Sequence, residues 1–315
     1  MEIDLSGLYQ RMQSAPRPVL PSGLHRGIVG CGYVGRAVAA SWRGAGHRIT
    51  ATATREESLA SLKPLVDQAV RFRSDEPDNA LAELAGCDGL LISLAPGGSR
   101  QAGEDAYRSV FLDGLQQIRA ALASRPASQP LQLVYLSSSA VYGDRRGQST
   151  DEHAPLDWTH PLNAVLAAAE QSVRSLRSEA VRVCVLRLGA IYGPGRDVPG
   201  QIRGAAGQVV LRNGDAVGGW IHRDDIVQAV DLAFDRGLDG VFNLVDDLEL
   251  SGRDLADAIC DQAGLPPVIF QAPSRSSGER VLNARIRNAR IKGQGLVLQH
   301  PSMLAWSRSV SGSLA

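Results

Sequence analysis

The chain has 315 residues, with 33 basic and 33 acidic side chains and a formal net charge of +0 at pH 7. This balance, without a basic block, gives no electrostatic reason to expect binding to nucleic acid or to an anionic membrane. No apolar run approaches the length of a transmembrane helix, and residues 1–22 lack the apolar core of a signal peptide. We therefore expect a cytoplasmic protein that binds a small-molecule substrate, with a homodimer as the candidate assembly.

A glycine-rich segment near the start of the chain predicts a dinucleotide site. A short apolar run ending at Val29 predicts a buried strand, and an alanine-rich helix is predicted over about 32–45. Between them lies Gly30-Cys31-Gly32-Tyr33-Val34-Gly35, a G-x-G-x-x-G pattern in its proper strand-to-helix setting. Gly30 allows a tight turn, Gly32 lets a pyrophosphate approach the backbone, and Gly35 lets the helix pack against the strand. We expect all six residues to bind the cofactor at the helix N-terminus; the alternative is a purely structural turn.

The end of the second predicted strand, over about 47–54, favours NADP over NAD. In such folds a carboxylate at this position binds the ribose 2′-hydroxyl of NAD and repels the 2′-phosphate of NADP. This chain has Thr54 and Arg55 there, and a guanidinium can bind a 2′-phosphate through two parallel charged hydrogen bonds. Glu56 and Glu57 are expected in the first turn of the next helix. The alternative for Arg55 is a solvated surface charge.

Alternating strands and helices predict an α/β fold with a doubly wound parallel sheet. Further strands are expected over 68–72, 87–95, 131–137 and 181–188, and helices over 77–85 and 103–124. The strand at 87–95 opens into the loop 96–99 at the carboxyl edge of the sheet, where ligands bind in such folds. Further cofactor-binding residues expected at strand ends are Leu94, Ala95, Ser137, Leu188 and Ile191.

The cysteines are scattered through the chain without the spacing of metal ligands. They are Cys31, Cys87, Cys184 and Cys260. Cys87 and Cys184 lie in or beside apolar strands, which indicates buried free thiols. We expect no metal site.

Five segments, in order, resemble the extended short-chain dehydrogenase/reductase superfamily, in its nucleotide-sugar epimerase and dehydratase branch. Besides the glycine loop they are 137–144 (SSSAVYGD), 187–195 (RLGAIYGPG), 220–226 (WIHRDDI) and 240–245 (GVFNLV). The resemblance runs from about Gly27 to Pro301. It implies a Rossmann domain that binds NAD(P) and a smaller C-terminal lobe that closes over a substrate.

The resemblance also implies domain boundaries. We expect an N-terminal arm over 1–22, the Rossmann domain over 23–192, and mainly substrate lobe over 193–315, with 220–245 returning to the Rossmann domain. The segment 277–287 (SGERVLNARIR) is similar to the tail of atypical members, in which catalytic motifs are often degraded while the glycine loop remains.

The family's catalytic tyrosine and lysine are absent from this chain. By its spacing to Val141-Tyr142-Gly143, Ser138 matches the family's catalytic hydroxyl residue. The positions of the tyrosine and of the lysine four residues later are occupied by Leu162 and Leu166. Leucine cannot hold or transfer a proton, and both residues continue an apolar helical stripe that predicts core packing.

Other candidates for proton transfer or substrate binding follow from residue type for the histidines and from the resemblance for the tyrosines and arginines. Tyr142 is a second catalytic candidate beside Ser138, and Tyr192 and three histidines are alternatives, namely His153, His160 and His222. Three arginines could meet substrate phosphates, with a surface role as the alternative: Arg196, Arg203 and Arg212.

Two functions fit the sequence. The first is an NADP-dependent oxidoreductase or epimerase-like enzyme with a non-standard acid-base group, acting on a small carbonyl, hydroxyl or nucleotide-sugar-like substrate. The alternative is a catalytically inactive NADP-sensing or regulatory binding protein, because the phosphate-binding loop is kept while the tyrosine and lysine are lost.

Overall fold

A seven-stranded parallel sheet forms the centre of the computed structural model, which describes residues 23–76, 80–96, 103–272 and 280–311. The strands follow the order β11-β7-β5-β4-β1-β2-β3. Their bounds are β1 His25–Val29, β2 Arg48–Ala53, β3 Gln68–Arg71, β4 Gly89–Ile92, β5 Leu131–Ser138, β7 Val181–Leu188 and β11 Gly240–Leu244. The order reverses between β1 and β4, so the doubly wound parallel sheet expected from the sequence is confirmed.

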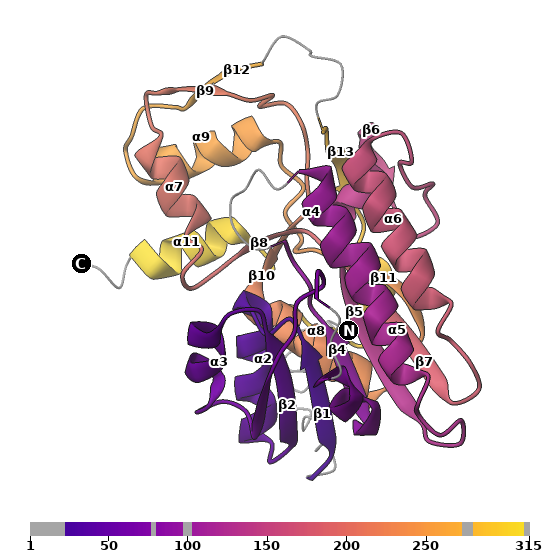
Figure 1. The fold of residues 1–315 in the computed structure, drawn as a ribbon. Coiled ribbons are helices and arrows are strands. Elements are labelled where there is room, and N and C mark those ends of the chain that lie inside the picture. Colours follow the sequence, from indigo (N-terminus) through magenta and orange to yellow (C-terminus); the bar gives the residue numbers. More distant parts are fainter. Residues whose placement is uncertain (1–22, 77–79, 97–102, 273–279, 312–315) are drawn as a thin grey trace, which may run out of the picture.

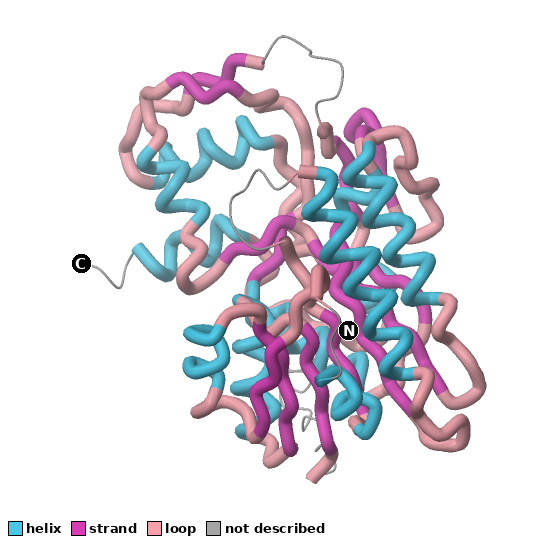
Figure 2. Tube along the Cα trace, in the orientation of Figure 1, coloured by secondary structure: helices cyan, strands magenta, loops and turns pink. Residues whose placement is uncertain are grey.

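Helices cover both faces of this sheet (Figures 1 and 2). One face carries α2 (Tyr33–Gly44), α3 (Glu56–Leu62), α8 (Arg223–Asp235) and α10 (Ala289–Gly293). The other carries η1 (Ala80–Gly86), α4 (Glu104–Arg108), η2 (Ser109–Asp113), α5 (Gly114–Leu122) and α6 (Pro161–Arg174). Each layer of helices covers one apolar core. Trp42 and Phe234 pack edge to face in the first core, and Leu166 and Tyr135 belong to the second. None of the described helices is long and apolar enough to cross a bilayer.

A smaller lobe sits beside the carboxyl edge of the sheet, at the upper left of Figure 1. Its helices are α7 (Val198–Gly204), α9 (Gly252–Gln262) and α11 (Met303–Ser311). Parallel two-stranded pairs complete the fold. They are β8 (Ala190–Tyr192) with β10 (Trp220–His222), β9 (Val209–Leu211) with β12 (Ile269–Gln271), and β6 (Asp144–Thr150) with β13 (Asn283–Ile286). The 3-10 turn η3 (Ser139–Tyr142) precedes β6. After β10 and α8 the chain returns to the large sheet as β11, and the domain boundaries expected from the resemblance stay predictions.

Several elements differ from the sequence expectation. The helix expected over 77–85 is the 3-10 helix Ala80–Gly86, and residues 77–79 lie outside the described part of the chain, as do the expected arm 1–22 and most of the 96–99 loop. The expected helix 103–124 is interrupted by a π-helical segment at Ser109–Asp113. Helix α8 begins at Arg223, because His222 caps it.

A buried ion pair joins α6 to the sheet. Arg187 Nη2 lies 2.7 Å from Glu170 Oε2, and the two side chains are 3% and 2% exposed. Ser137 Oγ donates to Glu170 Oε1 at 2.6 Å, and Arg187 Nη1 donates to the Tyr142 hydroxyl at 2.8 Å. This network fixes the end of β5 against α6 and β7, and its charges are compensated only while both partners are present.

Two buried carboxylates hold the C-terminal segment against the Rossmann domain. Asp225, in the first turn of α8, accepts hydrogen bonds from the backbone N–H groups of Gln299 at 2.6 Å and His300 at 3.1 Å. Asp246, just after β11, accepts from Tyr192 Oη at 3.1 Å and from Leu248 N at 3.2 Å. Burial raises the pKa of the Asp246 carboxyl to about 8.

Removing one partner of the buried ion pair should destabilise the fold. We expect Glu170→Leu to lower the free energy of unfolding by about 3–5 kcal/mol, since Arg187 is left buried and uncompensated. The double variant Glu170→Leu with Arg187→Met should recover much of that loss in urea unfolding. Single and double variants of equal stability would show that the charge pairing is unimportant.

The raised pKa of Asp246 predicts that the stability of the folded protein depends on pH. Between about pH 4 and pH 8 the folded protein retains a proton that the unfolded chain has released, so this group's contribution to stability falls as the pH rises through that window. The free energy of unfolding of Asp246→Asn, relative to the wild type, should therefore be higher at pH 8.5 than at pH 5. The exposed neighbour Asp247 supplies the control variant Asp247→Asn. An unchanged stability difference for Asp246→Asn at both pH values would contradict the assignment.

Candidate functional site

The glycine loop between β1 and α2 has the geometry that a dinucleotide requires. Gly30 has φ +84°, and a Cβ there would lie 2.5 Å from the carbonyl oxygen of Ser93. A Cβ on Gly35 would lie 3.0 Å from the Gly30 carbonyl oxygen and 3.3 Å from Ile28 Cγ2. The first glycine thus permits the turn, and the third permits close contact between helix and strand.

The middle glycine faces open space. A Cβ on Gly32 would have no heavy atom within 4 Å. Gly32 is the N-cap residue of α2, no side chain caps that end, and the first turn contains no acidic residue. The amide groups at the start of a helix lack intrahelical partners and carry the positive end of its dipole. The backbone at Gly32 is therefore open to a ligand at the start of α2, and the cofactor-binding roles expected for this loop stay predictions.

Strand β2 holds this loop in place. Gly30 N donates to Thr52 Oγ1 at 2.9 Å, and Cys31 N donates to the Thr52 carbonyl oxygen at 2.8 Å. Cys31 itself is buried, and burial raises the pKa of its thiol to about 12, so it is a packing residue. All four cysteines are buried and none forms a disulfide. Thr52 was missed by sequence reasoning, because its role depends on strand pairing.

Arg55 lies between β2 and α3, at the strand end where the sequence predicted it. It follows Thr54 after the end of β2 and is the N-cap residue of α3, with φ −121° and ψ 147°. Both side chains are exposed, and no described residue pairs with the Arg55 guanidinium. Glu56 and Glu57 lie in the first turn of α3, as expected. The guanidinium is therefore available to a ligand at this edge of the loop.

The remaining strand ends surround the reversal point of the sheet. Leu94 and Ala95 follow β4, and Leu94 is half-buried while Ala95 is exposed. Ser137 and Leu188 are buried at the ends of β5 and β7, and Ile191 lies in β8. The backbone of these positions borders the carboxyl edge, but the Ser137 hydroxyl is occupied by Glu170.

The two catalytic candidates have different surroundings. Ser138 is half-buried at the end of β5, and its Oγ accepts a hydrogen bond from Ala140 N at 3.2 Å, which leaves the hydroxyl proton available. Tyr142 is 1% exposed, and its hydroxyl donates to Asn243 Oδ1 at 2.7 Å while accepting from Arg187. Burial raises the pKa of Tyr142. Unlike the expectation, the Tyr142 hydroxyl is a part of the core network and does not reach the cleft.

Helix α6 shows what replaced the tyrosine and lysine. Leu166 is 3% exposed and packs in the second core, whereas Leu162 is half-buried in the first turn. Beside Leu162, the buried Asn163 donates to Asp157 Oδ2 at 2.7 Å and accepts from Arg280 Nε at 2.7 Å. Arg280 Nη1 also donates to the Tyr107 hydroxyl at 3.2 Å.

The structure thereby brings the 277–287 segment to the start of α6 through Arg280, although its residues 277–279 lie outside the described chain. Sequence reasoning missed Asn163 and Arg280 as a pair. The signal for it was a polar residue within an otherwise apolar helical stripe.

The histidines are structural groups in this fold. His222 is 1% exposed, and its Nδ1 accepts from Asp224 N at 3.2 Å, which caps α8. Burial lowers the pKa of His222 to about 4. His222, Asp224 and His300 each offer a possible metal-ligand atom within 4.8 Å of the others, but the Nδ1 lone pair of His222 is committed to the cap. His160 caps α6 in the same way, and His153 is exposed.

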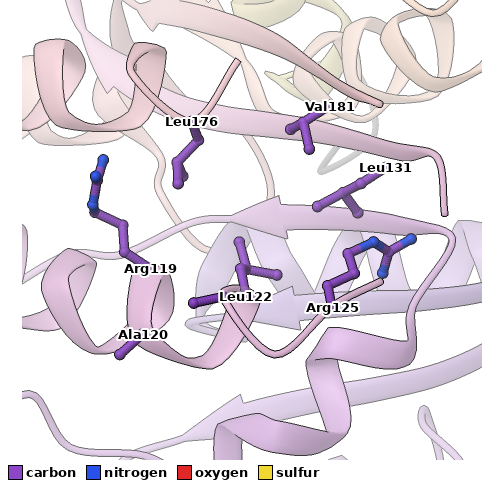
Figure 3. Close-up of a pocket in the computed structure, with 8 residues that line it drawn as sticks. Arg119, Ala120, Leu122, Arg125, Leu131, Leu176 and Val181 are labelled. Atoms are coloured by element: carbon purple, nitrogen blue, oxygen red, sulfur yellow. The ribbon is translucent and has the colours of Figure 1, made fainter. Parts of the chain in front are cut away.

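A separate cavity of about 380 Å³ lies at the opposite edge of the sheet (Figure 3). Leu131 and Val181, the first residues of β5 and β7, line it together with Leu122 and Leu176. The lining residues Arg119 and Arg125 donate to backbone carbonyl groups of Ser172 and Cys87. Because it opens at the amino ends of the strands, this cavity is not the cofactor site.

Comparisons with known proteins agree with this geometry. Residues 28–244 match the model of the NAD dependent epimerase/dehydratase family. Protein YeeZ of Escherichia coli is 27% identical over 210 residues, covering 65% of this chain and 71% of its own. The dTDP-6-deoxy-L-talose 4-dehydrogenase (NAD(P)(+)) of Kitasatospora kifunensis is 26% identical over 271 residues, covering 78% of this chain and 80% of its own.

A solved structure shows the same fold. It is that of a conserved protein of unknown function from Silicibacter pomeroyi, with a TM-score of 0.72 and 26% identity, covering 92% of this chain and 99% of the other. The resemblance to the extended short-chain dehydrogenase/reductase superfamily is therefore confirmed, and this chain belongs to the NAD dependent epimerase/dehydratase family.

Proposed function

We propose that this protein binds NADP at the glycine loop and transfers hydride to or from a small carbonyl, hydroxyl or nucleotide-sugar-like substrate. The open space beside Gly32, at the uncapped start of α2, is the observation that carries the proposal. Arg55 supports NADP over NAD, because its exposed guanidinium follows the strand end where NAD-binding members of such folds need a carboxylate. The similar Kitasatospora dehydrogenase, whose name includes both cofactors and a dTDP-sugar, supports the substrate class.

The acid-base chemistry must differ from that of the family's tyrosine and lysine. Bound nicotinamide supplies or accepts the hydride. Ser138 has a hydroxyl proton to donate to a substrate oxygen, since its lone pair already accepts from Ala140 N. Leu162 and Leu166 add only apolar surface, so we propose that the proton that accompanies the hydride is exchanged with solvent water.

The alternative function is a binding protein that senses NADP without turnover. It is favoured by one specific observation, the burial of Leu166 where the family has its lysine. In that case the cofactor would change a partner interaction or the oligomeric state, and the Ser138 hydroxyl would be dispensable.

Arg55 tests the cofactor preference. We expect Arg55→Ala to weaken NADP⁺ binding by about tenfold or more and to leave NAD⁺ within about twofold, because charged hydrogen bonds to the 2′-phosphate are lost. Calorimetric titration of both cofactors measures this. Arg48→Ala, an exposed arginine at the other end of β2, is the matched control. Equal losses for the two cofactors would contradict the 2′-phosphate role.

Ser138 tests turnover. Hydride transfer with NADPH should be measured against a panel of carbonyl compounds and nucleotide sugars, and Ser138→Ala should lower kcat by about 10²-fold or more while NADPH binding stays unchanged. Bound NADPH without oxidation by any compound would contradict the enzyme and favour the sensing protein. Turnover that Ser138→Ala leaves intact would contradict the role of Ser138 alone.

A further inference from the structure

The Tyr33 side chain joins the glycine loop to the turn that follows β8. Tyr33 is the first residue of α2, and its hydroxyl donates to the Pro194 carbonyl oxygen at 2.8 Å. Pro194 lies in a tight turn in which Gly193 N donates to Arg196 O at 3.2 Å and Arg196 N donates to Gly193 O at 2.8 Å. The turn that leads out of the Rossmann sheet is thus fastened to the residue beside the expected pyrophosphate.

Two arginines meet at the Tyr33 ring. The guanidinium carbon of Arg196 lies 4.4 Å from the ring centre and that of Arg223 lies 5.5 Å from it. Arg223 is neutralised by Asp224, with both Nε and Nη2 at 3.0 Å from Oδ1. Arg196 is exposed and has no carboxylate partner among the described residues. A net positive charge therefore remains beside the start of α2.

A second group in this region also lacks a partner. His222 Nε2 is buried and makes no hydrogen bond with any described residue. A Cβ on Gly193 would lie 3.0 Å from that nitrogen and 3.4 Å from the Tyr33 hydroxyl, so the bare Gly193 backbone separates the two polar groups. Because His222 Nδ1 accepts the cap of α8, Nε2 carries the proton of the neutral ring and is a donor.

We propose that Arg196 is a cofactor-binding residue of the small lobe: held against the Tyr33 ring, its guanidinium binds the dinucleotide pyrophosphate opposite the amide groups of α2. This inference rests on the proposed dinucleotide site. It assigns Arg196 to the cofactor, whereas position in the sequence alone had left it between a substrate phosphate and a surface charge. A pyrophosphate is dianionic and suits the forked donors of arginine, and the contact would bring the lobe onto the loaded Rossmann domain.

The test distinguishes binding of the pyrophosphate from binding of the 2′-phosphate of the same cofactor. Binding of NADP⁺, NAD⁺ and 2′-AMP, which has no pyrophosphate, is measured by calorimetric titration of the full chain. Arg196→Ala should weaken NADP⁺ and NAD⁺ by a similar factor of about tenfold and leave 2′-AMP within about twofold. Arg55→Ala should weaken 2′-AMP binding by about tenfold and leave NAD⁺ binding within about twofold. Arg253→Ala is the matched control, since Arg253 stacks on Phe270 elsewhere in the same lobe.

Each outcome is decisive for a different statement. A wild-type protein that binds none of the three ligands overturns the dinucleotide site itself. Unchanged NAD⁺ affinity in a folded Arg196→Ala protein overturns the role of Arg196 and leaves the site standing. An equal loss for 2′-AMP would also overturn it, because Arg196 would then act through the position of the lobe. Partial recovery of NAD⁺ affinity in Arg196→Lys supports a charge-based contact.

Discussion

The loop between β1 and α2 depends on glycine, for different reasons, at three positions. Gly35 lets α2 lie against β1, Gly30 lets the chain turn beneath the end of β4, and Gly32 leaves space at the start of the helix. A side chain at Gly30 would clash with the backbone of Ser93 after β4, and one at Gly35 would push α2 away from β1. A Cβ at Gly32 would meet no other part of the described protein. The first and third glycines thus serve the fold, whereas the second leaves space for the dinucleotide that we propose.

Local sequence was sufficient to predict the features that are themselves local. The glycine loop, the position of Arg55 beyond β2 and the apolar stripe through Leu166 are each defined within a few residues, and the structure has them where they were expected. Helix α7 and strand β9, between residues 196 and 219, were not among the predicted elements. The signal for the helix was present, since Asp197 caps α7 by accepting from Gly200 N and Pro199 lies in the first turn.

Contacts between distant segments could not be predicted in this way. Asp225 holds the backbone of residues 299 and 300, and Asn163 binds Arg280 more than a hundred positions later. Tyr142 looked like a site residue because of its neighbours in the sequence, yet Arg187 and Asn243 draw its hydroxyl into the core. Such roles are set by which strands pair and which helices cover them.

The replacement of the tyrosine and lysine changes the chemistry more than the fold. Leu166 fills a core position where a lysine would have to bury its charged group or carry it to the surface. Burial shifts the pKa of Tyr142 upward and that of His222 to about 4, so neither is suited to proton transfer near neutral pH. Of the two catalytic candidates, only Ser138, at the end of β5, keeps a hydroxyl proton that no described residue accepts.

The most direct measurement of the central claim is a crystal structure of the protein grown with NADP⁺. The account predicts a pyrophosphate over the amide groups that follow Gly32, with the 2′-phosphate at Arg55 and the nicotinamide facing Ser138. A dinucleotide bound elsewhere, or a loop beside Gly32 left empty at saturating cofactor, would contradict it.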